Sequence, residues 1–192
     1  MHAPRKFKKA FMAQLLLSLR AAGQASKSMG LRERRDAVRL SSDVAMALAR
    51  EPPRTTTWER ALVARHAAER RNEPLMRRIM GGPGYEMAAA AAARSRKEAR
   101  SRRVVRRSRR VCSAAAGSRK RRSLPAASGG GTMAAARRMV RARLQVLRSL
   151  VPGGEELRGF SLLSETLDYV VCLKAQVELM QCLCKGSRSQ LG

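Results

Sequence analysis

Two apolar stripes separated by a helix-breaking turn constrain the fold of this chain more than any other feature of its sequence. Over residues 140–151, apolar side chains recur at steps of three and four, which places them on one face of a helix. Residues 163–180 repeat this spacing. Between the stripes lie Pro152, Gly153 and Gly154. Proline lacks the amide that continues a helix and glycine supplies an open backbone, so the pattern predicts a helix, a loop and a second helix.

A helix-loop-helix unit of about 50 residues cannot bury enough apolar surface alone, because units of this size are marginal without metals, disulfides or partners. Pairing with a second unit gives a parallel four-helix bundle. We therefore expect an all-α fold whose helix-loop-helix hairpin forms such a bundle on dimerisation. The predicted dimerisation residues are Val140, Leu144, Leu147, Leu150 and Val151 in the first helix and Leu163, Leu167, Val170, Leu173, Val177 and Met180 in the second.

Individual residues of this unit match a known family in register. The matching residues are Leu144, Leu147 and residues 150–152 in the first helix, and Leu163, Glu165, Tyr169, Val170, Leu173, Gln176 and Val177 in the second. In these residues the unit resembles the plant form of the basic helix-loop-helix proteins. The resemblance implies that the partners are other helix-loop-helix proteins, in heterodimers or homodimers.

The DNA-reading positions of that family are altered in this chain. The family's His, Glu and Arg-x-Arg-Arg pattern, counted back from the proline of the loop, falls on Gly129, Met133, Ala134, Ala136 and Arg137, and only Arg137 matches. A glutamate reads a base because its carboxylate accepts a hydrogen bond from the cytosine amino group, which methionine cannot do. The chain is thus similar to the atypical, non-DNA-binding plant subgroup, and most similar to the increased-leaf-inclination-binding repressors of cell elongation. Residues 31–49 and 54–68 also resemble that subgroup.

The resemblance implies a nuclear transcriptional regulator. Such a protein heterodimerises through its helix-loop-helix, inhibits DNA binding or activation by partner factors, and negatively regulates cell elongation in brassinosteroid signalling. The heterodimer lacks one of two reading helices, so sequence-specific DNA binding should be weak or absent. Residual phosphate contacts are expected from Arg137, Arg138 and Arg141, with Arg143 nearby.

Basic residues dominate the composition, with 41 Lys and Arg against 14 Asp and Glu and a net charge of +27. Only three Phe, two Tyr and one Trp are present, which argues against one large core. Residues 94–122 hold 14 basic residues and 1 acidic residue. Two clusters in this block have the layout of a bipartite signal for a nuclear import carrier: Arg106 and Arg107, then Arg119, Lys120, Arg121 and Arg122. Such a block also attracts phosphate without sequence preference.

A second interpretation belongs to another class of protein. The chain would be an arginine-rich, non-specific nucleic-acid-binding protein, organellar in one form, whose C-terminal helices only form a hairpin core. The basic start followed by an apolar run leaves a secretory signal open, and the absence of acidic residues before Glu33 favours an organellar transit peptide over it. Residues 94–122 contain no aromatic side chain, which argues against sequence-specific RNA reading.

Three short helices are predicted in the N-terminal region, over residues 5–20, over residues 31–50 and from residue 56 onward. Thr56 and Glu59 form a capping-box pattern, in which two side chains satisfy the free amides at a helix start. Trp58 and Leu62 are then expected on the buried side of the third helix. The alternative is that Trp58 is exposed and forms a second binding surface for transcriptional partners.

We expect four regions: an N-terminal helical region over 1–80, an Ala/Arg-rich basic linker with the import signal over 81–132, the dimerisation domain over 133–184, and a disordered tail over 185–192. Glycines at 81–84 predict a flexible linker. The alanines that follow favour helix without a stripe to pack, and an arginine-rich helix is expected over 94–110. Residues 123–132 predict a second linker, which would break any continuous helix between the arginines and the first motif helix.

No catalytic set is recognisable in the sequence, and we expect neither enzyme activity nor a cofactor. The four cysteines, Cys112, Cys172, Cys182 and Cys184, lack the paired spacing of zinc ligands, so reduced thiols are expected. Ser161 and Ser164 lie where the second helix begins and are expected to be caps rather than nucleophiles. No stretch reaches the roughly 18 apolar residues of a membrane span.

Overall fold

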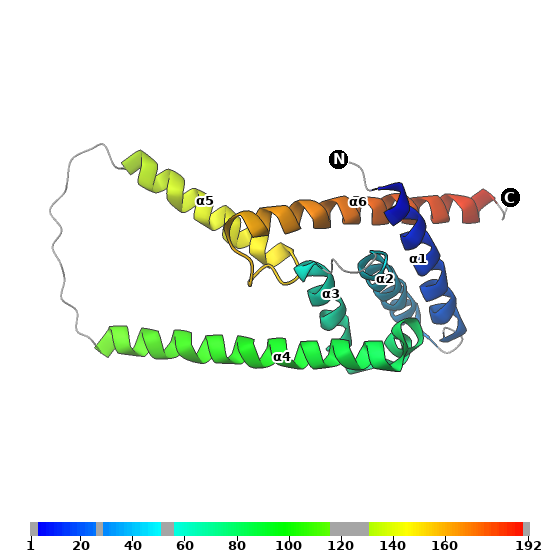
Figure 1. The fold of residues 1–192 in the computed structure, drawn as a ribbon, viewed down its shortest axis with the longest axis horizontal. Coiled ribbons are helices and arrows are strands. Elements are labelled where there is room, and N and C mark those ends of the chain that lie inside the picture. Colours follow the sequence, from blue (N-terminus) through cyan, green and yellow to red (C-terminus); the bar gives the residue numbers. More distant parts are fainter. Residues whose placement is uncertain (1–3, 26–28, 51–55, 116–130, 190–192) are drawn as a thin grey trace. The chain divides into compact units, whose positions relative to one another are not determined.

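The computed structural model describes residues 4–25, 29–50, 56–115 and 131–189, and the regular structure in these ranges is entirely helical (Figure 1). The elements in chain order are α1 (Arg5–Ala25), α2 (Leu31–Leu48), α3 (Thr57–Ala67), the short 3-10 helix η2 (Arg70–Asn72), α4 (Glu73–Ala115), α5 (Gly131–Leu150) and α6 (Gly159–Ser189). The predicted all-α class is confirmed. The chain divides into two compact units, Met1–Ala92 with Leu147–Gly192, and Ala93–Val146.

The first core of the larger unit is built from α1, α2, α3 and α6. Phe7, Phe11 and Leu15 are buried at steps of four along α1, as the apolar spacing predicts. They pack in one cluster with Met46 of α2, with Trp58 and Leu62 of α3, and with Cys172 and Ala175 of α6. The N-terminal helices therefore pack on the second helix of the motif as well as on one another.

A second core lies where α1, α2 and α3 meet the beginning of α4, with Leu40, Val44 and Val63 buried beside Leu75 and Met76. The prediction of a flexible glycine linker at residues 81–84 is wrong, because the helix resumes directly after Gly81. Gly81 has a φ of 76°, which changes the direction of the helix at this residue. The alanine tract also differs from expectation. Tyr85, Ala88 and Ala92 are buried at steps of three and four, so the tract does carry a packed stripe.

The three predicted N-terminal helices are confirmed, and the capping pattern before α3 forms. The Glu59 carboxylate accepts the Thr56 N–H at 2.8 Å. The Trp58 side chain is 0% exposed. The alternative of an exposed tryptophan that binds partners is therefore wrong, because the Trp58 side chain is buried in the first core of its own chain.

The smaller unit contains the C-terminal part of α4 and most of α5. The arginine-rich helix expected over residues 94–110 is confirmed as part of α4, which ends at Ala115. Residues 116–130 lie outside the described ranges, and with them the second import cluster at 119–122, Gly129 and most of the second expected linker. Within the described ranges, no helix has both the length and the apolar character needed to cross a lipid bilayer.

Candidate functional site on helix α6

The loop of the motif is a tight turn seated on α3. The Val151 amide donates to the Leu147 carbonyl and the Gly154 amide donates to the Val151 carbonyl, so the chain turns immediately after α5. Gly153 has a φ of +72°, and a Cβ atom there would lie 2.9 Å from the Cβ of Ala61. The glycine is thus required twice, for its backbone angle and for its close approach to α3.

Helix α6 has two faces with different roles. Its inner face contacts the N-terminal helices and carries the buried residues Leu162, Cys172 and Ala175. On the opposite side, the large apolar residues Phe160, Leu163, Leu167, Val170 and Val177 are all exposed. We call these five residues the outer stripe. Their spacing of three, four, three and seven residues places them along one line of the helix.

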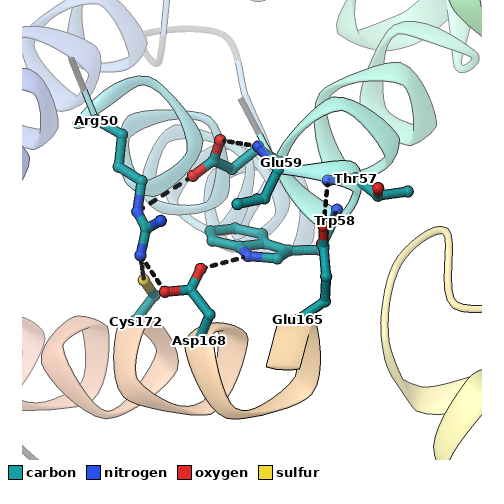
Figure 2. A network of polar contacts seen from close by, with 8 residues as sticks. Arg50, Thr57, Trp58, Glu59, Glu165, Asp168 and Cys172 are labelled. Carbon is teal, nitrogen blue, oxygen red and sulfur yellow. Dashed lines mark hydrogen bonds and ion pairs between the residues drawn. The ribbon is translucent and has the colours of Figure 1, made fainter. Parts of the chain in front are cut away.

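Glu165 on the inner face caps α3 from another part of the chain (Figure 2). Its carboxylate accepts the Thr57 N–H at 3.0 Å and the Trp58 N–H at 3.1 Å. The first amides of an α-helix have no partner within the helix, and the helix dipole favours an anion at this end. A carboxylate from α6 therefore fixes the end of α3 to α6.

Asp168 lies one turn further along the inner face and accepts two donors. The indole Nε1 of Trp58 donates to it at 2.9 Å, and the Arg50 guanidinium forms an ion pair with its other oxygen (Figure 2). Arg50 Nε lies 3.3 Å from Glu59, so the guanidinium links α6 to α3. Burial raises the pKa of the Glu59 carboxyl, because the Thr56 amide and Arg50 only partly offset its lost hydration.

Cys172 lies below the same guanidinium, with its Sγ 3.8 Å from Arg50 (Figure 2). Burial, reinforced by the Asp168 carboxylate, raises the pKa of the thiol to about 11. The thiol is therefore protonated at neutral pH and is a poor nucleophile. Its role is to fill the core beside Trp58.

A second polar cluster joins α6 to α2. Gln176 donates to Ser42 and, at 3.1 Å, to Asp43, and the opposite oxygen of Asp43 lies 2.9 Å from His66 Nε2. Burial opposes ionisation of Asp43, but the hydrogen bonds from His66 and Gln176 outweigh it and lower the pKa of the carboxyl. The position of the inner face of α6 against the N-terminal helices is thus fixed by paired polar groups as well as by apolar contacts.

The predicted dimerisation residues divide between the two faces. Val151 is buried, and Leu173 and Met180 pack partly buried against the first core. Leu144 and Leu147 of α5 are half-buried. The exposed ones are Val140, Leu150, Leu163, Leu167, Val170 and Val177. The predicted phosphate-contacting residues Arg137, Arg138 and Arg141 are exposed on α5, and Arg107 of the import signal is exposed on α4.

Sequence reasoning assigned no structural role to the residues that fix the inner face, which are Arg50, Glu165, Asp168 and Gln176. Glu165 and Gln176 are noted only as residues that match the family. A signal existed in the three-residue spacing of the two carboxylates, which puts both on the side of the helix away from the outer stripe. These polar contacts hold α6 against the N-terminal helices and leave its outer stripe exposed. Among the described residues, no group of three His, Cys, Asp or Glu side chains is placed to bind a metal ion.

Comparison with known proteins also identifies the N-terminal helices as a domain. The profile of the IBH1-like N-terminal domain matches residues 4–70, which are the helices that pack on α6. Transcription factor IBH1-like 1 from Arabidopsis thaliana is 31% identical over 182 residues, covering 94% of this chain and 93% of the relative. Transcription factor IBH1 from Oryza sativa subsp. japonica is 56% identical over 39 residues, covering 20% of this chain and 19% of the relative.

No solved structure matches the chain. The family is established by the match along nearly the whole length of the Arabidopsis relative, and it agrees with the resemblance noted in the helix-loop-helix residues. The chain therefore belongs to the plant IBH1-like family of atypical helix-loop-helix transcription factors, and it is a transcriptional regulator rather than an enzyme.

Proposed function

We propose that this regulator is a nuclear repressor that pairs with DNA-binding helix-loop-helix factors and prevents them from binding DNA. The observation that carries the proposal is the outer stripe of α6. The inner face of the helix is already occupied by the N-terminal helices, whereas five large apolar side chains on the opposite face are exposed, Phe160 by 86% and Leu167 by 52%. Exposed apolar surface of this kind on a soluble domain marks an interaction site.

The energetics support pairing through this face. Burial of a large apolar side chain contributes roughly 1.5–3 kcal/mol, so covering several residues of the outer stripe can offset the entropy cost of association. An amphipathic helix from a partner, with apolar residues at the same three- and four-residue spacing, has the matching chemistry. Leu150 at the end of α5 is also exposed and would add to the surface.

The inhibitory mechanism follows from the residues at the DNA-reading positions. Met133 stands where the family's glutamate reads a base, and its thioether cannot accept the hydrogen bond from cytosine. A heterodimer then has one reading helix in place of two, and each lost base pair costs roughly 1–3 kcal/mol of discrimination. The partner would lose its six-base site. Arg137, Arg138 and Arg141 would retain only weak contacts with phosphate.

Two further parts of the proposal concern the nuclear localisation of the protein and the signalling pathway in which it acts. Arg106, Arg107 and the basic cluster at 119–122 would act as the import signal that brings the chain to the nucleus. The resemblance of the motif to the increased-leaf-inclination-binding repressors supports a role as a negative regulator of cell elongation in brassinosteroid signalling, and the similarity to proteins named as transcription factors supports a role in transcription.

A mobility-shift titration tests the proposal. A DNA-binding helix-loop-helix partner is held on its labelled six-base site and the full chain is added. With an excess of unlabelled duplex of unrelated sequence to suppress sequence-independent binding, we expect loss of the complex without a slower band, because the heterodimer leaves the site. Leu167→Glu should require at least about tenfold more protein, since pairing would bury an unpaired carboxylate.

Ser161→Glu is the matched control, because it adds the same charge at an exposed position of α6 outside the outer stripe. Leu167 is a cleaner probe than Leu173, whose side chain also packs on the core. Persistence of the partner–DNA complex with the wild-type chain, or equal inhibition by Leu167→Glu, would show that the proposed pairing is wrong.

A further inference from the structure

The C-terminal part of α4 presents a basic surface that the proposed pairing does not use. Residues 94–110 contain ten basic residues and one acidic residue, Glu98, and all of them lie in one continuous helix. Glu98 lies 3.7 Å from Arg102 one turn away. The single acidic side chain therefore neutralises only part of the charge of this segment.

Three arginines line up on one face of this segment. Arg100, Arg103 and Arg107 follow one another at steps of three and four residues, and all three side chains are exposed. Their seven-residue span corresponds to about 10 Å along the helix axis. Successive phosphates of one DNA strand lie about 3.4 Å apart along the duplex axis, so this span corresponds to about three steps from one phosphate to the next.

We propose that this segment of α4 is a binding site for the phosphate backbone of duplex DNA, independent of base sequence. An α-helix with its side chains is about 10–12 Å across and fits the major groove of B-form DNA, which is about 12 Å wide. The major groove of an A-form RNA helix is too deep and narrow to admit it. Residues 94–110 carry no aromatic side chain on which unpaired bases could stack, which disfavours single strands.

The site would let the protein remain on DNA while it lacks the residues that read bases. It is separate from the α5 positions where the family's reading residues fall, so loss of base reading at Met133 does not remove it. An acidic carrier protein is the other class of macromolecule that such a charge would attract. The phosphate spacing and the helical conformation favour the duplex.

The test is fluorescence anisotropy of a labelled duplex of arbitrary sequence with the full chain alone, between about 50 and 200 mM salt. The variant Arg100→Gln/Arg103→Gln/Arg107→Gln should reduce the slope of log K against log salt by about 2.7, since each phosphate contact contributes about 0.9. The matched control Arg5→Gln/Lys6→Gln/Lys9→Gln removes the same charge from exposed positions of α1 and should leave the slope unchanged.

Circular dichroism establishes that both triple variants stay helical. Equal slopes for the two variants would overturn the proposal, because net charge and not this face would then set the affinity. Equal or tighter binding of single-stranded DNA or duplex RNA would also overturn it. So would an α4 variant with unchanged DNA affinity and lost nuclear accumulation, which would assign the face to the import carrier.

Discussion

At the scale of single residues, a few positions decide whether the motif can pack against the N-terminal helices. Gly153 is the most restricted of them, because the loop approaches α3 so closely that a side chain at this position would collide with Ala61 and Thr57. Glu165 and Asp168 are the next, because their partners are backbone amides and an indole that have no other acceptor in the contacts described above. These residues connect the loop and second helix of the motif to a domain more than 80 residues earlier in the chain.

Gly153→Ala should destabilise the protein by about 1–3 kcal/mol, from left-handed backbone strain and from the 2.9 Å approach to Ala61. The free energy of unfolding by urea, followed by Trp58 fluorescence, measures this. Gly23→Ala is the matched control, since a Cβ there meets nothing within 4 Å and the residue lies within α1. The control should be neutral or stabilise by up to about 1 kcal/mol. Equal stability of the two variants would contradict the seating of the loop on α3.

The two buried carboxylates should respond to pH in opposite directions. The pKa of Asp43 is lowered below the usual 3.8, so its stabilising contribution is present above that pH and is lost as pH falls through the lowered value. The advantage of the wild type over Asp43→Asn should therefore shrink on acidification. The pKa of Glu59 is raised above the usual 4.5, so the stability of the wild type relative to Glu59→Gln should grow as pH falls.

Unfolding by urea at a series of pH values measures both differences in the free energy of unfolding. The two variants serve as controls for each other, because the many other carboxylates of the chain contribute equally to both comparisons. Parallel pH dependence of the two differences would show that the hydrogen bonds at Asp43 and the burial of Glu59 do not set their ionisation.

At the scale of elements, the helices and the loop were accessible from sequence, and the inner face of α6 was not. Apolar spacing and punctuation by proline and glycine predicted α1, α2, α3, α5 and α6, because these signals are local. The apolar spacing predicts a single apolar face on α6, and that face includes Leu173 and Met180, which in the structure pack against the first core. Glu165, Asp168 and Gln176 look like solvent-facing residues in the sequence, and their partners lie 107 to 134 residues away in the chain.

The alanine tract of α4 shows a second limit of local reading. Alanine contributes little to an apolar pattern, so the stripe of Tyr85, Ala88 and Ala92 is visible only once the second core covers it. The same holds for the glycines before it. A single glycine with positive φ redirects a helix as effectively as it begins a loop, and sequence alone does not distinguish the two.

Asp168→Ala should loosen the contact between α6 and α3. The substitution leaves the Trp58 indole and the Arg50 guanidinium without their shared acceptor, and we expect a loss of about 1–3 kcal/mol in the free energy of unfolding. Glu98→Ala removes an exposed ion pair on α4 and should change stability by less than about 1 kcal/mol. A loss for Asp168→Ala no larger than that of the control would contradict the role of this carboxylate.

At the scale of the whole molecule, the larger unit joins the family's N-terminal domain and the second motif helix in one packed body. The inner face of α6 packs on the N-terminal helices and its outer stripe is exposed, so the helix can pair with a partner while it keeps its contacts within its own chain. The protein contains a single tryptophan, Trp58, which lies in that contact with its ring 5.0 Å from the ring of Tyr169 on α6. Trp58 is therefore a built-in reporter of whether α6 stays docked.

The most direct test of this account is the emission of Trp58 while the full chain is titrated with a DNA-binding helix-loop-helix partner whose own tryptophans have been replaced by phenylalanine. Loss of the partner from its labelled site shows in parallel that the pair has formed. We expect the emission to keep the wavelength of a buried indole throughout, because the partner covers the outer stripe and α6 stays on α3. A shift to the wavelength of a hydrated indole as the pair forms would mean that the partner takes the inner face, and would contradict the account.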